Sequence, residues 1–461
     1  LIPAREDAMK PFEFMVSESQ ERMLAVLTPE KLDEAMAICT KWGLLSTVIG
    51  EVTDTGNFVV REGDEIVADM PAATLADDAP IYDPAMERPA YLDEVQAFDP
   101  MTLDHPESVE MLNDTLLGLL ASPNICSRRW IWEQYDHQVG ANTVVLPGSD
   151  AAVIRIGDTG RGEMTNRGIA ASTDCNGRYC YLDPYTGAQI ALAEAARNVA
   201  CSGGEPAAIT DCLNFGSPEK PEVFWTFHEA IRGMSDACKA WNIPVISGNV
   251  SFYNESFGNP IYPTPTVGLV GLLDDISQHC TAAFKDDGDV VVLLGETENE
   301  LGGSEYLKVG FETVAGMPPA LDLELEAAVQ KTVREGIKAG LVKSAHDCSE
   351  GGVAVAIAEC CVSGRIGADV HLHDELPAVA SLFSETQSRI VVTCSEADAE
   401  ALVELALANE IPYGVIGTVT GDRLHVCEKI DLPVDILVEA FEPTLEMLVR
   451  GEMQTEELFE G

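Results

Sequence analysis

The chain has 461 residues, of which 46% are hydrophobic and 23% are charged, and its 77 acidic and 28 basic side chains give a formal net charge of −49. This length accommodates two to four globular domains, and so acidic a chain repels phosphate backbones, which excludes nucleic acid as a partner. No run of about 18 apolar residues occurs, so we expect a cytoplasmic protein without a membrane partner.

The first part of the chain is predicted to hold an incomplete α/β module and a linker. Within residues 1–75, an apolar run typical of a strand follows residues 17–22, and an Ala/Leu/Glu-rich helical stretch comes next. Residues 76–140 begin rich in Pro and Asp, which indicates a linker, and their pattern becomes helical near 107–120.

The remainder alternates between strand and helix patterns, which predicts an α/β (α+β) fold with two further modules, residues 141–275 and 285–450. The predicted strands are 151–156, 207–210, 245–246, 266–273 and 289–294. The predicted helices are 188–200, 223–241, 323–339 and 352–362.

An internal repeat organises this sequence. Residues 17–22 are Ser-Glu-Ser-Gln-Glu-Arg and residues 384–389 are Ser-Glu-Thr-Gln-Ser-Arg, while Val-Ile-Gly-x-Val-Thr occurs at 48–53 and again at 415–420. Both pairs are 367 residues apart, which predicts a duplicated α/β module. The second copy is preceded by patterned sequence from near Thr143, whereas only sixteen residues precede the first. We therefore expect one whole module to be missing upstream.

Polar residues follow the apolar strands of 141–275 at three places. Asp174 ends one strand, Asp211 ends the next, and Gly248, Asn249 and Ser251 follow a third. Carboxylate and amide oxygens suit a hard cation, and glycine allows a ligand to approach the backbone closely. The three positions predict one shared rim, although each residue taken singly is also a common turn residue.

Two further segments carry candidate ligands. Glu194 and Asn198 are four residues apart on the helix predicted at 188–200, so they share a face and could hold Mg²⁺ on a nucleotide, or simply face solvent. Asp347 and Ser349 precede a helix that begins with two glycines, and such a helix N-terminus favours an anion. His346 is interpreted as an orienting histidine, and Asp150, in Gly148-Ser-Asp, as a β-turn residue.

Five strings in the chain resemble one family closely, namely the synthetase subunit of formylglycinamidine ribonucleotide synthase (phosphoribosylformylglycinamidine synthase) in its small form. The strings are Ser17-Glu-Ser-Gln-Glu-Arg, Asn124-Ile-Cys-Ser-Arg-Arg-Trp, Thr210-Asp-Cys-Leu-Asn-Phe-Gly, Gly248-Asn-Val-Ser and Tyr262-Pro-Thr-Pro. The resemblance covers essentially the whole chain.

This resemblance implies a fold and a reaction. The fold is the duplicated aminoimidazole-ribonucleotide-synthetase fold, in which N-type and C-type modules alternate, here as one and a half repeats. The reaction converts formylglycinamide ribonucleotide, ATP and ammonia to the amidine, ADP and phosphate, with Mg²⁺. The implied partners are a glutaminase subunit, which supplies ammonia, and a small bridging subunit.

The resemblance also assigns roles to residues. It implies that Glu18, Ser19, Gln20 and Ser251 bind the ribonucleotide, that Asp211, Gly248 and Ser349 bind ATP, and that Asn249, Glu194, Asn198 and Asp347 are metal ligands. The family's catalytic histidines fall in the N-type module that we expect to be missing, so no catalytic residue is assigned and the chain alone is expected to be inactive.

The chain departs from the family pattern in four ways, and two other functions are alternatives. Besides the missing module, Cys175 and Ser247 replace common glycines, and Glu350 replaces a common Asp. One alternative is a non-catalytic nucleotide-binding scaffold of the same complex, which would bind ADP without turnover. The other is a related enzyme of this fold, such as thiamine-phosphate kinase, selenophosphate synthetase or a hydrogenase-maturation protein, but such chains are shorter and lack the repeat.

Overall fold

The computed structural model describes residues 2–4, 6–157, 164–372 and 375–452, and these residues form two compact units. The first unit comprises residues 1–83 and the second comprises residues 84–461. Each unit is described separately below.

The first unit holds two helices and a β-hairpin. Its elements are α1 (Pro11–Val16), α2 (Leu32–Lys41), β1 (Asn57–Glu62) and β2 (Glu65–Pro71), with short 3-10 turns at Pro29–Lys31 and Ala72–Leu75. The two strands pair antiparallel, with a register shift between Val60 and Arg61. None of the described residues of this unit is buried, so it has no hydrophobic core of its own.

The strand expected after residues 17–22 in the first copy of the repeat is not formed. Residues 23–27 and 48–53 are irregular, and Met23 and Val52 are largely exposed. In the second copy, the strand that follows residues 384–389 pairs with strands 290–294 and 344–347, both of which precede it in the chain. A strand needs such neighbours to satisfy its backbone groups, and in the described part of the first unit only β1 and β2 are strands. The helix expected next is present as α2.

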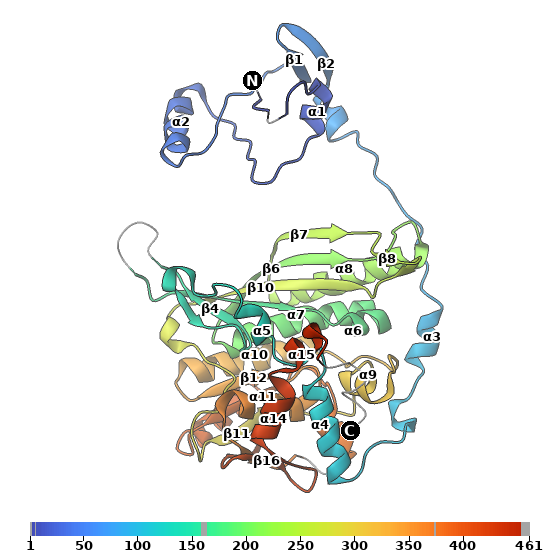
Figure 1. The fold of residues 1–461 in the computed structure, drawn as a ribbon, viewed down its shortest axis with the longest axis vertical. Coiled ribbons are helices and arrows are strands. Elements are labelled where there is room, and N and C mark those ends of the chain that lie inside the picture. Colours follow the sequence, from blue (N-terminus) through green and yellow to red (C-terminus); the bar gives the residue numbers. More distant parts are fainter. Residues whose placement is uncertain (1, 5, 158–163, 373–374, 453–461) are drawn as a thin grey trace. The chain divides into compact units, whose positions relative to one another are not determined.

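The second unit contains a six-stranded sheet in the order β3-β4-β5-β10-β6-β7. The strands are β3 (Thr143–Val145), β4 (Ala152–Arg155), β5 (Gly168–Asp174), β6 (Glu205–Asn214), β7 (Val245–Ser251) and β10 (Thr264–Leu273). Helices α6 (Gly177–Leu182), α7 (Pro184–Cys201) and α8 (Pro221–Trp241) lie along one face of this sheet (Figure 1). A small hairpin, β8 (Glu255–Ser256) with β9 (Asn259–Pro260), follows β7.

The same unit contains a seven-stranded sheet in the order β12-β14-β11-β15-β13-β16-β17. Its strands are β11 (Val290–Leu294), β12 (Ser344–Asp347), β13 (Ala368–Val370), β14 (Ile390–Cys394), β15 (Tyr413–Val419), β16 (Arg423–Val426) and β17 (Ile430–Pro433). The accompanying helices are α9 (Glu305–Phe311), α10 (Leu323–Lys338), α11 (Gly352–Gly364), α12 (Ala378–Phe383), α13 (Ala399–Ala408), α14 (Val434–Phe441) and α15 (Thr444–Arg450).

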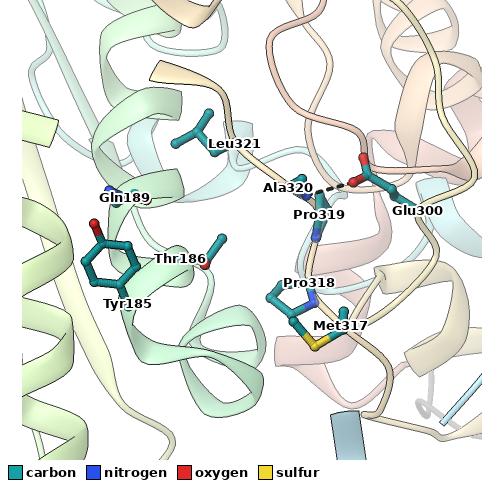
Figure 2. Close-up of a pocket in the computed structure, with 9 residues that line it drawn as sticks. All are labelled: Tyr185, Thr186, Gln189, Glu300, Met317, Pro318, Pro319, Ala320 and Leu321. Atoms are coloured by element: carbon teal, nitrogen blue, oxygen red, sulfur yellow. Dashed lines mark hydrogen bonds between the residues drawn. The ribbon is translucent and has the colours of Figure 1, made fainter. Parts of the chain in front are cut away.

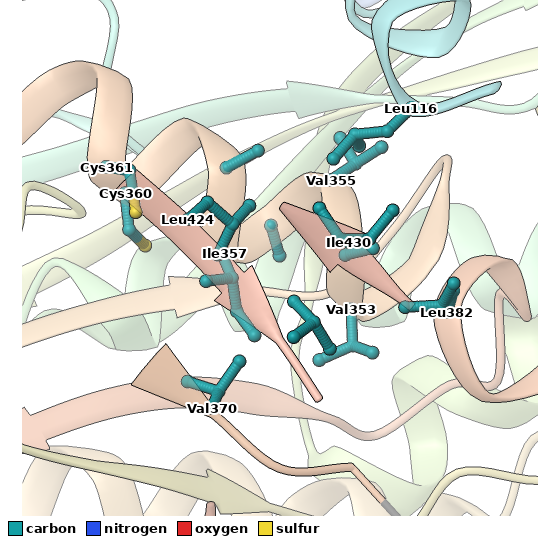
Figure 3. Packing of buried hydrophobic residues seen from close by; sticks show 14 of the residues in the cluster. Leu116, Val353, Val355, Ile357, Cys360, Cys361, Val370, Leu382, Leu424 and Ile430 are labelled. Atoms are coloured by element: carbon teal, nitrogen blue, oxygen red, sulfur yellow. The ribbon is translucent and has the colours of Figure 1, made fainter. Parts of the chain in front are cut away.

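The hydrophobic core of the seven-stranded part includes a helix from the segment that was predicted to be a linker. The linker holds α3 (Tyr91–Gln96), α4 (Val109–Leu120) and α5 (Arg129–Trp132). Leu116 of α4 packs in one buried cluster with Val355 and Ile357 of α11, and with Leu424 and Ile430 from the sheet (Figure 3). The helix predicted near 107–120 is therefore present and belongs to this core.

Helix α7 joins the two sheets of the second unit. Its Pro, Gly, Ala and Leu residues are almost all buried, which suits a central helix covered on every side. Ala195 and Val199 pack against the six-stranded sheet, whereas Ala200 and Cys201 pack with Val292 and Val329 of the seven-stranded part. The side chains of α7 are thus positioned between the two sheets.

No helix in the described residues is both long enough and apolar enough to span a membrane.

Candidate functional site

A cluster of acidic residues forms where α7 meets the ends of β5 and β12. Asp174 is the last residue of β5, Asp347 is the last residue of β12, and Glu194 and Asn198 lie on α7. The Asn198 Nδ2 atom donates a hydrogen bond to Asp174 Oδ1 at 2.9 Å. The i,i+4 spacing on α7 and the two strand ends therefore bring these predicted ligands together.

The electrostatics of this cluster favour a bound cation. Burial, together with the charges of Asp347 and Glu350, raises the pKa of Asp174 to about 8. Burial also raises the pKa of Glu194 well above its usual value. Burial raises the pKa of Asp347 to about 7, although the nearby Arg197 guanidinium opposes that shift. These carboxylates disfavour each other's ionisation because like charges repel. A positive ion would reduce that repulsion and stabilise their charged forms.

Two carboxylate oxygens at the cluster have no hydrogen-bond donor. Asp174 Oδ2 and Asp347 Oδ2 are buried and accept no hydrogen bond from the described residues, and the latter lies 3.5 Å from Arg197 Nε. Buried polar atoms are normally satisfied, so unpartnered oxygens need an explanation. Carboxylate and amide oxygens are the donors that Mg²⁺ prefers, and the residues present therefore fit that ion.

His346 contacts two further carboxylates next to this cluster, on the side of the seven-stranded sheet. Its Nδ1 atom lies 3.1 Å from both carboxylate oxygens of Asp150, and its Nε2 atom lies 3.0 Å from Glu359 Oε2. Burial alone would lower the pKa of His346, but Asp150 and Glu359 raise it well above its usual value. Asp150 Oδ1 also accepts the backbone N–H of Asp347 at 2.9 Å. Asp150 therefore orients both His346 and Asp347, a role that its turn position did not reveal.

The second group of predicted residues lies on β6 and β7. Val267 of β10 pairs with both Asp174 and Asp211, and Asp211 pairs with Gly248, so these residues form one row across the sheet. A Cβ atom on Gly248 would lie only 2.4 Å from Asp211 Oδ1, so glycine is what leaves room for this carboxylate. Asp211 borders a hollow of about 680 Å³ beside α8, and burial raises its pKa.

Asn249 and Ser251 have the opposite strand parity from Gly248, so their side chains lie on the other face of β7. Asn249 is exposed, whereas Ser251 is half-buried and contacts Asn254, with 3.3 Å between Ser251 Oγ and Asn254 Oδ1. The predicted single rim is therefore two groups, because buried Val267 separates Asp174 from Asp211 in the row. Within the described residues, Glu194 and Asn198 adjoin Asp174 rather than the residues on β7.

At the start of α11, which was predicted to bind an anion, one backbone N–H group donates to a carboxylate of the protein itself. The backbone N–H of Gly351, at the start of α11, donates to Glu385 Oε1 at 2.7 Å. Glu385 Oε1 also accepts the backbone N–H of Glu305 at 2.8 Å. Ser349 lies beside this turn, where its carbonyl oxygen accepts from Gly352 at 3.0 Å. The Gly351 amide is therefore occupied by a carboxylate of the second repeat, and anion binding at the rest of this helix start stays a prediction.

The two copies of the repeated motif differ in their surroundings. In the second copy, Gln387 Oε1 accepts from Arg197 Nη2 at 3.0 Å, and Tyr179 donates a hydrogen bond to Glu385. Every residue of 384–389 is buried. In the first copy, the side chains of Glu18, Ser19 and Gln20 are exposed. The second copy is thus filled by the protein's own side chains, and the first is not.

A further hollow of about 450 Å³ lies between the first turns of α7 and the loop 317–321 (Figure 2). Tyr185, Thr186 and Gln189 line one side, and Glu300 Oε1 accepts the backbone N–H of Ala320 at 2.8 Å on the other. None of the residues predicted for the site lines this hollow, and its composition assigns no ligand to it.

The fold and the site define a class of protein. The N-terminal domain of the AIR synthase related proteins matches residues 148–273, and the C-terminal domain of those proteins matches residues 1–63 and 286–428. The chain belongs to the AIR synthase related family. The order of the matches, a C-terminal domain followed by an N-terminal and a second C-terminal domain, agrees with the repeat at 367 residues.

Within this family the chain is similar to one particular enzyme subunit. It is 50% identical over 426 residues to the phosphoribosylformylglycinamidine synthase subunit PurL of Moorella thermoacetica, covering 92% of this chain and 57% of that protein. It is 49% identical over 454 residues to the same subunit of Alkaliphilus metalliredigens, covering 98% of this chain and 60% of that protein. The resemblance that the motifs predicted is confirmed, and the chain spans 57% to 60% of the length of these two relatives.

Solved structures confirm the α/β fold class. PurL from T. maritima in complex with ADP matches with a TM-score of 0.60 and 26% identity, covering 91% of this chain and 58% of that chain. The complex of the same protein with ATP matches with a TM-score of 0.59 and 25% identity over the same shares of the two chains.

The raised pKa of Asp174 predicts that the chelator-treated protein loses stability as pH rises. The folded state holds a proton on Asp174 up to about pH 8, whereas the unfolded chain releases it near pH 4. The free energy of unfolding should therefore fall between about pH 4 and about pH 8, by up to about 1.4 kcal/mol per pH unit. Mg²⁺ should restore more stability at the upper end of this range.

Denaturant unfolding at several pH values, with and without Mg²⁺, measures this effect, and Asp174→Asn is the matched control. The variant should show a flatter pH profile and a smaller gain from Mg²⁺. A profile that rises with pH, or one that Asp174→Asn leaves unchanged, would contradict the assignment.

Proposed function

We propose that the chain is part of an ATP-dependent carbon–nitrogen ligase that converts formylglycinamide ribonucleotide and ammonia to formylglycinamidine ribonucleotide, ADP and phosphate in purine biosynthesis. The observation that carries the proposal is the similarity to the synthase subunits, which extends over 92% to 98% of this chain at about half identity. The similar PurL of T. maritima forms complexes with ATP and with ADP, which supports nucleotide binding.

The roles proposed for the residues follow the arrangement on β6 and β7. Asp211 and Gly248 would bind ATP, because the carboxylate of Asp211 borders the hollow beside α8 and the neighbouring Gly248 leaves room for that carboxylate. On the other face of β7, Asn249 is proposed as a magnesium ligand, and Ser251 as a contact to the ribonucleotide. Glu18, Ser19 and Gln20 are the remaining substrate contacts, and their exposure leaves them accessible.

The acidic cluster between α7 and β12 is proposed as a second magnesium–nucleotide site. Glu194, Asn198 and Asp347 would hold the ion, with Ser349 near the phosphates. The unpartnered oxygens of Asp174 and Asp347 support this proposal. Because Tyr179, Arg197 and Gly351 already occupy the acceptors of the loop 384–389, this site would bind a nucleotide without taking up the ribonucleotide.

The chemistry requires activation of an amide oxygen, which is a poor leaving group. The γ-phosphoryl group of ATP is transferred to that oxygen, ADP departs, ammonia adds to the carbon, and phosphate leaves with the oxygen while a proton is lost. Magnesium would neutralise charge on the transferring phosphoryl group. The residues of this chain would bind and orient the two substrates. The general acid and base are expected on an N-type module outside this sequence.

The proposed partners are a glutaminase subunit and a small bridging subunit. We find no nucleophile-elbow cysteine segment in the sequence, so ammonia would come from the glutaminase.

Calorimetry with Mg²⁺–ADP distinguishes the two proposed nucleotide sites. We predict that Asn249→Ala weakens binding at the β7 site at least about 10-fold, since a lost contact to a charged group costs about 1.5 kcal/mol or more. Glu194→Gln should weaken binding only at the second site. Asn259→Ala, on the exposed hairpin, is the control. Unchanged affinity in Asn249→Ala would place the nucleotide elsewhere.

The reaction itself is tested with the chain complemented by an N-type module from a synthase relative, with ammonia as nitrogen donor. The complemented chain should form the amidine, and the chain alone should not. Gln20→Ala should raise the KM for the ribonucleotide by about 10- to 150-fold. Gln387→Ala should mainly lower the unfolding temperature, because Arg197 loses a buried partner.

Two results would contradict this account. ADP binding without turnover in the complemented chain would favour a scaffold role. A Gln387→Ala variant that harms substrate binding as much as Gln20→Ala would reverse the roles of the two copies.

A further inference from the structure

The arginine that ends each copy of the repeated motif folds back onto the start of the motif. In the second copy, Arg389 is fully buried, and its Nη2 atom donates to the carbonyl oxygen of Ser384 at 2.6 Å. Its Nε atom donates to the carbonyl oxygen of Thr386 at 2.8 Å. The residue before it, Ser388, has φ of +59°. A left-handed residue and an arginine thus close this six-residue loop on itself.

The first copy has the same closure at the equivalent positions. Arg22 Nη2 donates to the carbonyl oxygen of Ser17, and Glu21 has φ of +61°. Position 17 corresponds to 384, 21 to 388 and 22 to 389 at the offset of 367 residues. One copy lies in a packed core and the other is exposed, so the shared closure does not depend on the surroundings. The six residues themselves specify it.

The backbone conformation at Glu21 and Ser388 is unfavourable by itself. A left-handed residue other than glycine costs about 1–2 kcal/mol, and such strain persists where other contacts over-determine it. Neither copy has glycine there. Both copies share the hydrogen bond from the arginine Nη2 atom to the carbonyl oxygen of the first motif residue, and this hydrogen bond offsets the cost.

The buried copy shows what the closed loop does with the side chains between its ends. Glu385 Oε1 accepts backbone N–H groups from Glu305 and Gly351, and Gln387 Oε1 accepts from the guanidinium of Arg197. These donors come from other elements, so the closed loop directs its Glu and Gln oxygens outward as acceptors. The exposed copy offers Glu18 and Gln20 at the same positions.

We propose that Arg22 is a positioning residue that holds Glu18, Ser19 and Gln20 in a conformation ready to accept N–H or O–H donors of the ribonucleotide. This assignment rests on the proposed function, because it takes that loop as the substrate contact. Arg22 itself does not touch the substrate. Its effect is to remove conformational freedom that binding would otherwise have to restrict.

The test measures the affinity of the complemented chain for formylglycinamide ribonucleotide, together with KM and kcat. Arg22→Gln should weaken binding and raise KM about 10-fold, the value expected when a charge-assisted hydrogen bond is lost, with little change in kcat. Arg61→Gln, on β1 of the same unit, changes the net charge equally and should leave both constants unchanged. Arg22→Lys keeps one donor and should recover part of the affinity.

The outcomes separate this inference from the proposed function. A wild-type chain that does not bind the ribonucleotide would overturn the proposed function and the inference with it. A wild-type chain that binds, with Arg22→Gln equal to Arg61→Gln, would overturn the inference alone. Arg22→Gln could also increase the proteolysis of residues 1–83, and in that case the affinity of Arg22→Lys for the ribonucleotide is the deciding measurement. An Arg22→Lys variant that recovers no affinity would overturn the positioning role.

Discussion

The packing of the second unit depends on the contacts of one fully buried side chain, Arg197. Its guanidinium reaches Glu326 of α10 at 2.9 Å and Gln387 of the second repeat at 3.0 Å, and its Nε atom lies 3.5 Å from Asp347. One side chain of α7 therefore contacts helix α10, the loop 384–389 and the end of β12. Burying these charges costs several kcal/mol per ion unless each is paired, so every contact around Arg197 is constrained. Its single positive charge does not balance the carboxylates nearby, and we propose that this excess of negative charge attracts a cation to the cluster.

The duplication explains why two similar loops have different surroundings. Both copies keep the closing arginine and the left-handed residue before it. Only the second copy has Tyr179, Arg197 and the start of α11 packed onto its Glu and Gln. A loop whose acceptors are already satisfied contributes to stability, whereas an identical loop with free acceptors can bind a ligand. The same local sequence thus serves two purposes according to what packs against it.

The sequence predicted the parts of this structure that local patterns determine. The predicted helices at 188–200, 223–241, 323–339 and 352–362 are present as α7, α8, α10 and α11, with ends shifted by a few residues. The i,i+4 spacing predicted that Glu194 and Asn198 share one face of α7, and this face lies near Asp174 at the end of β5 and Asp347 at the end of β12. These relations depend on helix and strand periodicity, which a single sequence displays.

Features that depend on distant segments were not predictable in this way. Glu326, Glu359 and Asp150 join the cluster from elements far away in the chain, and no local spacing marks them. The run after residues 17–22 has the apolar pattern of a strand, but such a pattern forms a strand only where neighbouring strands accept its hydrogen bonds. Nothing local shows that Glu385 accepts a hydrogen bond from Gly351 at the start of α11.

The central claim is that the carboxylates around α7 exceed what Arg197 can neutralise and therefore bind one divalent cation. Titration of the chelator-treated chain with Mn²⁺, followed by electron paramagnetic resonance of the free ion, measures this directly. Wild type should take up a tightly bound ion that Glu194→Gln loses, while Glu110→Gln, on the exposed face of α4, retains it. Equal uptake by Glu194→Gln and Glu110→Gln, or no tight binding by wild type, would contradict the account.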